Sequence, residues 1–488
     1  MAKAAKELAV ERPREARLRR PERAHRKLTG SIMIASHTHL DRVERHRSSG
    51  EIRVRATSEA GRFAPGPPLT WRRQRGHSRG SIVLNPNRTY QEVLGFGAAL
   101  TDAACYLLQG LAPSHLEPFL HELFDPGAMG LNVSRICMGA SDYATEIYSY
   151  DEGNPDPEMQ RFSIDHDRRH ILPILKRVRE VCPDLFLLAS PWSPPGWMKA
   201  GGSMLGGSMQ RKHLAAYAEY FLKFLESYAA AGCAAEAVTV QNEVDTDQDG
   251  LMPACLWGQG SETRFVAEHL GPRLAERNIK TKIWILDHNY DLWGRALSEL
   301  ADANVSRYVD GVAWHAYAGQ PSSMTLVHKA HPDKHMYWTE GGPEDLHDPL
   351  YQTNWTFWSS RFAEILHNWA RCIIAWNLAL DENGRPNIGP FACGGLVTID
   401  SQTKQITPSG QYWALVHYSH AIRRGARRIE SRGALKGVSH VAFLNPDESC
   451  AMVLTNAGVD KRVCLRLSGV ETEVDLPGDS VVTLIWNG

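Results

Sequence analysis

The feature that most constrains the fold is an alternation of strand-like and helix-like segments that begins at Gln91 and runs for roughly 300 residues. Each strand-like segment is a short apolar run, of the kind that a parallel sheet buries on both faces. Helical periodicity lies between most of these runs and is clearest over 212–230, where apolar residues recur at i, i+3 and i+4. The strand-like segments are 95–100, 132–140, 185–193, 238–244, 283–289, 311–318, 336–342 and 373–380.

This alternation predicts an α/β fold, the (β/α)8 or TIM barrel. A doubly wound open sheet would alternate in the same way, but its first strand should lead into a Gly-rich phosphate-binding turn that opens a helix. The stretch GFGAALTD (95–102) contains only part of such a turn. We therefore expect the barrel.

The two ends of the chain follow a different pattern. Short strand-like pieces separated by Gly and Pro fill 51–90, and similar pieces follow an amphipathic segment at 412–422. Neither set can bury a core alone, so together they predict a small β-sandwich built from both chain ends. Four regions result: a basic, disordered extension (1–50), the N-terminal sandwich strands (51–90), the catalytic barrel (91–411) and the C-terminal sandwich strands (412–488).

Charge and composition exclude several classes of protein. Residues 1–50 hold 13 Lys and Arg against 6 Asp and Glu, whereas the remainder holds 41 against 49, and a mildly acidic body argues against nucleic acid as a ligand. No apolar run approaches the ~18 residues of a spanning helix, so we expect no stable membrane insertion. The 9 cysteines, without a C-x-x-C pair, indicate buried thiols. As written, the chain is expected in the cytoplasm, or in a secreted or periplasmic location if its true start is different.

Polar residues stand where nearly every strand-like segment ends. A parallel barrel gathers these ends at one face, which is where barrel enzymes place their catalytic groups. Two of the segments end in carboxylates, Glu243 after AVTVQN and Glu340 after HMYWT. The other polar or aromatic strand-end residues are Arg135, Asp142, Trp192, Asn242, Asp287, His288, Asn289, His315, Tyr317, Trp376 and Asn377.

Two carboxylates at separate strand ends suit cleavage of a glycosidic bond. One protonates the leaving oxygen while the other attacks the anomeric carbon, at a separation of about 5–5.5 Å in retaining enzymes, against about 6.5–9.5 Å in inverting ones. The sequence gives no distance between Glu243 and Glu340, so the residues alone leave the stereochemistry open. Tryptophans near the strand ends could stack on a sugar, although we expect about half of them to fill the core.

Six stretches, in family order from about Asn85 to the C-terminal end, resemble glycoside hydrolase family 30, the glucosylceramidase family. They are GFGAALTDAA (95–104), SRICMGASDYA (134–144), LLASPWSPPGWMK (187–199), VTVQNE (238–243), WTEGG (338–342) and WNLALDENGRPN (376–387). The resemblance implies a barrel joined to a β-sandwich and a retaining β-glycosidase that acts on β-glucosides without a cofactor or metal. A carbohydrate or glycolipid is then the expected substrate.

The resemblance also implies roles for individual residues. Glu243 would be the acid/base and Glu340 the nucleophile, with Arg135 holding Glu340 ionised. Glu243 must then be protonated at working pH, so we expect its pKa to be raised, partly by Glu340. The residues expected to bind substrate are Asp142, Trp192, Asn242, His315, Tyr317, Trp376 and Asn387.

Two departures from the family pattern keep alternatives open. Val244 replaces the Pro usual after the acid/base, and Ala316 replaces a Trp between His315 and Tyr317. These departures leave a non-hydrolytic carbohydrate-binding protein, a β-xylosidase, a β-fucosidase and an endo-β-1,6-glucanase as alternatives. A metal at 287–289 is not expected, because no second pair of ligands at metal-binding spacing accompanies this run.

Overall fold

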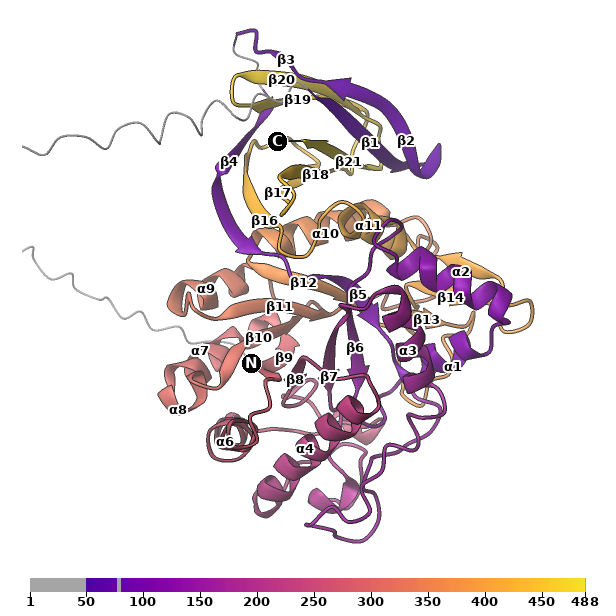
Figure 1. Ribbon diagram of the computed structural model, residues 1–488, viewed down its shortest axis with the longest axis vertical. Helices are drawn as coiled ribbons and strands as arrows, with labels where there is room; N and C mark the ends of the chain where they lie inside the picture. The colour runs from indigo at the N-terminus through magenta and orange to yellow at the C-terminus, as the bar shows by residue number, and fades with distance from the viewer. Residues whose placement is uncertain (1–49, 77–79, 488) are drawn as a thin grey trace, which may run out of the picture. The chain divides into compact units, whose positions relative to one another are not determined.

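The computed structural model describes residues 50–76 and 80–487; apart from Gly50, the predicted basic extension lies outside the described residues. Eight parallel strands close into a barrel whose order around the ring follows the chain, as the alternation predicted (Figure 1). The strands are β5 (Gly95–Ala99), β6 (Val133–Cys137), β7 (Phe186–Ser190), β8 (Ala237–Thr239), β9 (Lys282–Asn289), β10 (Val309–His315), β11 (His335–Glu340) and β12 (Ala370–Ala375).

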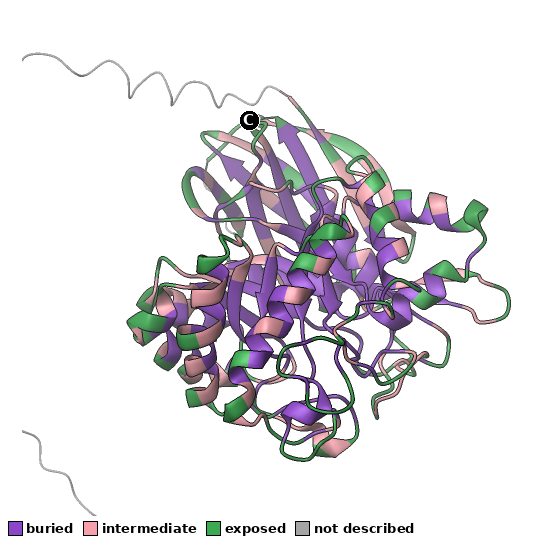
Figure 2. Ribbon diagram, turned by 60° about the horizontal axis from the view of Figure 1, so that its bottom comes forward, coloured by how far each residue is buried: buried purple, intermediate pink, exposed green. Residues whose placement is uncertain are grey.

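Helices surround these strands, with buried faces toward the barrel and exposed faces outward (Figure 2). The α-helices are α1 (Asp102–Gln109), α2 (Pro113–Phe124), α3 (Ile171–Val181), α4 (Leu214–Ala230), α5 (Gln259–Arg264), α6 (Gly271–Glu276), α7 (Trp293–Ala301), α8 (Ala303–Ser306), α9 (Ser322–Ala330), α10 (Trp355–His367) and α11 (Gly410–Ser419). A π-helical turn, Phe265–Leu270, joins α5 to α6.

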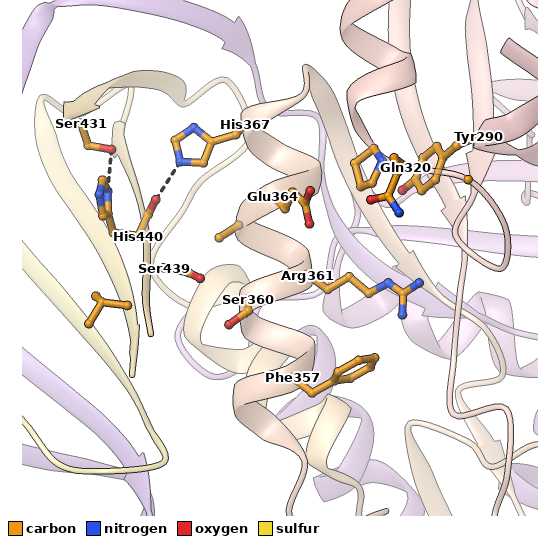
Figure 3. A pocket seen from close by; sticks show the side chains of 14 residues that line it. Tyr290, Gln320, Phe357, Ser360, Arg361, Glu364, His367, Ser431, Ser439 and His440 are labelled. Carbon is orange, nitrogen blue, oxygen red and sulfur yellow. Dashed lines mark hydrogen bonds between the residues drawn. The ribbon is translucent and has the colours of Figure 1, made fainter. Parts of the chain in front are cut away.

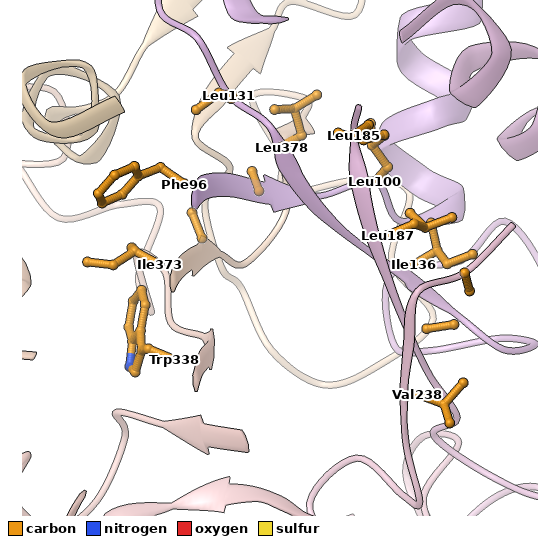
Figure 4. Packing of buried hydrophobic residues seen from close by; sticks show 14 of the residues in the cluster. Phe96, Leu100, Leu131, Ile136, Leu185, Leu187, Val238, Trp338, Ile373 and Leu378 are labelled. Atoms are coloured by element: carbon orange, nitrogen blue, oxygen red, sulfur yellow. The ribbon is translucent and has the colours of Figure 1, made fainter. Parts of the chain in front are cut away.

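The barrel strands are apolar on both faces because each side meets a different core. Along β7, Phe186 and Leu188 belong to the cluster inside the barrel, whereas Leu187 packs in the cluster shared with the helices. Inside the barrel Phe186 stacks on Trp284, with ring centroids 5.8 Å apart. Figure 4 shows part of the outer cluster, including Leu187 and Val238. Two packed faces explain why these segments read as continuous apolar runs.

Seven of the eight barrel strands end earlier at their carboxyl end than the sequence predicted, and β8 and β12 fall short the most. β8 ends at Thr239 rather than 244, β10 ends at His315 rather than 318, and β12 ends at Ala375 rather than 380. The backbone turns left-handed at Glu243 (φ 52°) and at Asn377 (φ 53°), beyond the ends of β8 and β12. These early ends turn the chain into the mouth of the barrel.

Strands from both chain ends form a second sheet, which makes the predicted sandwich. Its order is β2-β1-β21-β18-β17-β16-β4-β19-β20-β3, so strands from before and after the barrel pair directly. Apolar residues such as Ile52, Met452 and Trp486 form its own core. The strands are β1 (Glu51–Ser58), β2 (Gly61–Thr70), β3 (Arg72–Arg73), β4 (Ser81–Glu92), β16 (Arg427–Arg432), β17 (Val438–Leu444), β18 (Ser449–Asn456), β19 (Lys461–Leu467), β20 (Val470–Leu476) and β21 (Ser480–Asn487).

Helices α10 and α11 lie between the barrel and this sandwich (Figure 1). A separate three-stranded sheet, of β13 (Ala379–Leu380), β14 (Val397–Ile399) and β15 (Ile406–Pro408), follows the last barrel strand. Within 50–76 and 80–487, no helix is both long and apolar enough to cross a membrane. The 9 cysteines are all free thiols, and those at 393 and 464 alone are partly exposed.

Candidate active site

A cavity of about 420 Å³ opens at the carboxyl ends of the barrel strands. Both predicted carboxylates line it, together with Asp142, Trp192, Asn242, Thr246, Gln248, Met252, His288, Asn289, Tyr317, Glu344, Trp376, Phe391 and Cys393. A larger hollow of about 630 Å³ lies where α10 meets β16 and β17 of the sandwich (Figure 3). Its single acidic lining residue is Glu364, so paired-carboxylate chemistry belongs to the barrel cavity.

Glu243 reaches this cavity from an irregular stretch beyond β8. The Asn242 amide donates to Pro191 O at 2.8 Å, and the Glu243 amide donates to Asp287 O at 2.9 Å. These bonds hold the left-handed backbone of Glu243, a conformation that is costly for a residue with a side chain and concentrates at functional sites. Val244 is fully buried in the core and does not line the cavity, so replacement of the family's Pro leaves the carboxylate in place.

Glu340 is the last residue of β11 and is held by two neighbours. Arg135 Nη1 donates to Glu340 Oε2 at 3.0 Å, and the Tyr317 hydroxyl donates to Oε1 at 3.1 Å. Arg135 is completely buried on β6, and its Nη2 donates to Asn242 Oδ1 at 2.8 Å. One guanidinium therefore holds both the Glu340 carboxylate and the side-chain amide of Asn242, the residue next to Glu243.

In the sequence, the strand end at Asp287 raises only the question of metal binding. In the structure, Asp287 is a buried carboxylate that accepts hydrogen bonds from several residues beneath the cavity. It is fully buried and accepts hydrogen bonds from Arg135 Nη2 (2.8 Å) and His315 Nε2 (3.0 Å). The hydroxyls of Thr239 and Thr339 donate to it at 2.7 and 2.8 Å. These contacts, above all Arg135, lower the pKa of Asp287 despite its burial, so it is an anion that orients its neighbours.

His315 lies between the two carboxylates of the cavity. Its Nδ1 is 3.4 Å from Glu243 Oε1 and 3.8 Å from Glu340 Oε1. Burial alone would lower its pKa, but the surrounding Glu340, Asp287 and Glu243 raise the pKa of His315 to about 9. His315 is therefore an imidazolium at neutral pH.

The pKa values of the carboxylate pair reverse the expectation from sequence. Burial raises the pKa of Glu243, but hydrogen bonding and charge from His315, with the Gln248 amide at 2.7 Å, outweigh burial and lower it. The pKa of Glu340 is raised, because burial and the nearby Glu243 and Asp287 charges outweigh His315 and Arg135. The retaining mechanism requires the proton on Glu243 and the charge on Glu340. The pKa shifts instead make Glu243 bind the shared proton less tightly than Glu340.

Trp192 and Trp376 form an aromatic wall of the cavity. Their rings stack with centroids 5.1 Å apart and planes 19° apart, and the Arg135 guanidinium lies 4.8 Å from the Trp192 centroid. Asp142 lines the same cavity, and burial together with Glu340 and Glu243 raises the pKa of Asp142 well above its usual range. A neutral carboxyl beside an indole wall can donate to a sugar hydroxyl.

Of the predicted substrate-binding residues, His315 and Asn387 do not line the cavity, and Asn387 lies in a loop beside it. Its Oδ1 accepts from the Gly389 amide at 2.6 Å, and its Nδ2 donates to Phe391 O. The loop it stabilises packs on Asp142: Ile388 N donates to Asp142 O at 2.7 Å, and a Cβ at Gly389 would lie 2.5 Å from Asp142 Cβ. In this structure Asn387 shapes the loop and Phe391 reaches the cavity.

Several cavity residues were not predicted. Thr246, Gln248 and Phe391 lie on loops, where sequence periodicity gives no signal, whereas Asn289 is the last residue of β9 and was named only as a strand-end residue. His288 is 8% exposed, and its Nδ1, 3.9 Å from Glu243 Oε1, has no hydrogen-bond partner. Glu243, His288 and His315 offer ligand atoms within 4.8 Å of one another, which could hold a metal ion. The folded chain thus supplies the second ligands that the sequence spacing around 287–289 did not show.

The distance between the carboxylates defines a class of protein. Because His315 Nδ1 is close to both, Glu243 Oε1 and Glu340 Oε1 are at most about 7 Å apart, which includes the ~5–5.5 Å of retaining glycosidases and excludes most of the inverting range. A paired-carboxylate cavity at the carboxyl face of a (β/α)8 barrel is the site of a glycoside hydrolase.

Comparison with known proteins places the chain within this class. The glycosyl hydrolase family 30 TIM-barrel domain matches residues 93–422, and the family's β-sandwich domain matches 425–484. The chain belongs to glycosyl hydrolase family 30, and it is a retaining glycosidase of that family.

Relatives of different specificity are about equally similar. An endo-1,6-beta-D-glucanase of Neurospora crassa is 29% identical over 85% of this chain and 87% of its own length. The lysosomal acid glucosylceramidase of Mus musculus is 28% identical over 83% of each. The solved structure of the endo-beta1,6-glucanase BT3312 superposes with a TM-score of 0.81 at 27% identity, covering 90% of this chain and 100% of that one.

Proposed function

We propose that this enzyme hydrolyses β-1,6-linked glucan by double displacement, with Glu340 as the nucleophile and Glu243 as the acid/base. The observation that carries the proposal is the pair of carboxylates facing one cavity on either side of His315. Arg135 and Tyr317 hold Glu340 with both oxygens oriented, whereas Glu243 is held at one oxygen by a loop amide that a substrate can replace.

In the first step a Glu340 oxygen attacks the anomeric carbon while Glu243 transfers its proton to the departing glycosidic oxygen. This forms a covalent glycosyl-enzyme and releases the aglycone. Loss of the Glu340 charge lowers the proton affinity of Glu243, which then removes a proton from an incoming water. Attack by that water on the anomeric carbon releases Glu340 and a sugar of the original β configuration.

A sugar aglycone is supported by the residues that surround Glu243. Thr246 and Gln248 line the cavity and bond to Glu243, and their hydroxyl and amide groups hydrogen-bond a second sugar better than the apolar chains of a ceramide. Ala316 is consistent with this side being open, since the family's Trp is absent there. Similarity to endo-1,6-glucanases supports the same substrate.

Glucosylceramide is the second candidate, supported by the mouse relative and by Phe391, which lines the cavity and is 44% exposed.

The test compares purified enzyme on β-1,6-glucan, β-1,3-glucan, glucosylceramide in detergent, and aryl β-glucosides and β-xylosides. We expect the highest kcat/KM on β-1,6-glucan, with oligosaccharide products. Higher kcat/KM on glucosylceramide, or on the aryl xyloside, would refute the proposed substrate while leaving the chemistry intact.

The roles of the two glutamates are tested separately. We expect Glu340→Ala to abolish hydrolysis and Glu243→Ala to lower kcat on glucan by about 100- to 10,000-fold. On an aryl β-glucoside whose leaving group departs without a proton, azide should rescue Glu243→Ala and give a β-glucosyl azide, because azide attacks the glycosyl-enzyme where water does. Glu276→Gln, at the exposed end of α6, is the matched control and should behave as the parent enzyme. An α-azide, or full activity in Glu340→Ala, would contradict the assignment.

A further inference from the structure

Beyond its place in hydrolysis, the Glu243 side of the cavity has the composition of a transition-metal site. One carboxylate and two imidazoles, Glu243, His288 and His315, converge with ligand atoms within 4.8 Å of one another. Two His and one Glu are a donor set that zinc accepts, with an open fourth position for water. We propose that these three residues bind a divalent transition ion such as Zn²⁺, and that the bound ion reversibly blocks hydrolysis. The blocking effect rests on the proposed role of Glu243, whereas the binding does not.

The distances between the donor atoms are close to those of a coordinated ion. Metal–ligand bonds of ~2.0–2.2 Å in a tetrahedron place donor atoms about 3.4 Å apart. Glu243 Oε1 is already 3.4 Å from His315 Nδ1 and 3.9 Å from His288 Nδ1. The donor atoms of the third pair, on His288 and His315, lie within 4.8 Å of each other, so coordination has to shorten this separation.

His288 is the residue that points to a ligand rather than to packing. It is 8% exposed, lines the cavity, and its Nδ1 faces Glu243 without a hydrogen-bond partner. A buried ring nitrogen without a partner is costly, and coordination is one way in which it is satisfied.

His315 carries the support that metal-binding histidines usually have. Its Nε2 donates to Asp287 Oδ1 at 3.0 Å, which leaves Nδ1 directed at Glu243. A carboxylate behind the second ring nitrogen orients the ligand and strengthens its donation to the ion. Thr339 and Arg135 fix that carboxylate in turn, so the second layer of the site is already built.

Binding of the ion would stop the reaction at a defined atom. Zn²⁺ on Glu243 Oε1 displaces the proton that this carboxyl must give to the leaving oxygen, and it takes the place of the proton on His315 Nδ1. Glu340 keeps its hydrogen bonds from Arg135 and Tyr317, so the nucleophile itself is not bound by the ion. The inhibition is expected to be complete at saturation and reversed by a chelator.

The experiment titrates ZnCl₂ into the full chain by calorimetry without any glycoside, and locates the ion by anomalous scattering from crystals soaked in ZnCl₂. We expect one equivalent bound at Glu243, His288 and His315, with affinity at least about 10-fold lower in His288→Asn and in Glu243→Gln. His115→Asn, an exposed histidine on α2, should bind as the parent does. In parallel, ZnCl₂ should abolish hydrolysis by the parent enzyme, and EDTA should restore it.

The outcomes separate this inference from the proposed function. Equal zinc affinity in the parent and His288→Asn, an anomalous peak elsewhere, or full hydrolysis at saturating zinc would overturn the metal site or its effect. Zinc bound at the three residues by a protein that hydrolyses no glucan or glucoside would instead refute the proposed function and leave the site standing. Circular dichroism of each variant shows whether a loss of affinity reflects a loss of fold.

Discussion

At the scale of single residues, catalysis depends on where the carboxylate pair keeps its proton. When two interacting groups share one proton, only the form with the proton on Glu243 and the charge on Glu340 is productive. The pKa shifts of the two residues favour the opposite placement, because His315 and Gln248 outweigh burial at Glu243, whereas burial outweighs His315 and Arg135 at Glu340. A substrate that replaces the Gln248 amide with its glycosidic oxygen removes one contact that favours the anion, and so favours the productive form.

Gln248→Ala tests this account. Gln248 Nε2 donates to Glu243 Oε2 at 2.7 Å, and loss of a donor to a carboxylate raises its pKa. We expect the basic limb of the kcat/KM profile on an aryl β-glucoside, which reports the free enzyme, to move to higher pH by about half a unit. Gln402→Ala, an exposed glutamine remote from the cavity, should leave the profile unchanged. A basic limb that stays in place or moves to lower pH would contradict the role given to Gln248.

At the scale of secondary-structure elements, hydrogen bonds to Asp287 connect several strands of the barrel. It lies on β9 and accepts from Arg135 on β6, Thr239 on β8, His315 on β10 and Thr339 on β11. Five of the eight strands therefore meet at one buried carboxylate, which explains how residues far apart in sequence are held in register beneath the cavity.

Asp287→Asn should lower stability and activity together. An amide cannot accept at both positions, so a buried Arg135 loses one of its two anions, a change expected to cost about 3 kcal/mol of unfolding free energy. Urea titration measures this cost, and kcat/KM should fall with it because Arg135 also orients Glu340. Asp291→Asn, exposed just beyond β9, should change stability by less than about 0.5 kcal/mol. If Asp287→Asn lowered the free energy of unfolding by less than about 1 kcal/mol, the hydrogen bonds to Asp287 would not be needed for stability.

The same elements show what the sequence can and cannot predict. The eight strands and the positions of Glu243 and Glu340 follow from short apolar runs with polar ends, because burial on both faces leaves a clear pattern. Asp287 lay in the same pattern, but its role depends on four partners from four strands, which spacing along the chain does not encode. Gln248 and Phe391 come from loops, whose conformation follows from turn geometry and from tertiary contacts rather than periodicity.

At the scale of the whole molecule, the barrel and the sandwich share one buried histidine. His417, on α11, bonds through Nδ1 to Thr483 Oγ1 of β21 and through Nε2 to Thr57 Oγ1 of β1, both at 2.8 Å. The helix also packs on β5 of the barrel. A neutral imidazole, with one nitrogen donating and the other accepting, thus joins the barrel to the strands from both chain ends.

His417 predicts how the stability of the whole chain depends on pH. Burial and the nearby His420 lower the pKa of His417 to about 3, whereas in the unfolded chain it is about 6.5. As pH falls from about 6.5 toward 3, the unfolded chain binds a proton that the folded chain does not, so the free energy of unfolding decreases. Integrated over this window, His417 contributes a decrease of up to about 5 kcal/mol.

His417→Gln should remove this part of the pH dependence. Glutamine can still bond to one threonine and does not titrate, so the variant should lose stability less steeply than the parent between pH 6 and 4, by about one proton in the linkage slope. Urea unfolding at a series of pH values measures both slopes, with the exposed His347→Gln as the matched control. Parallel slopes for the parent and His417→Gln would mean that the imidazole is protonated in the fold, and that acid unfolding begins elsewhere than at the junction of barrel and sandwich.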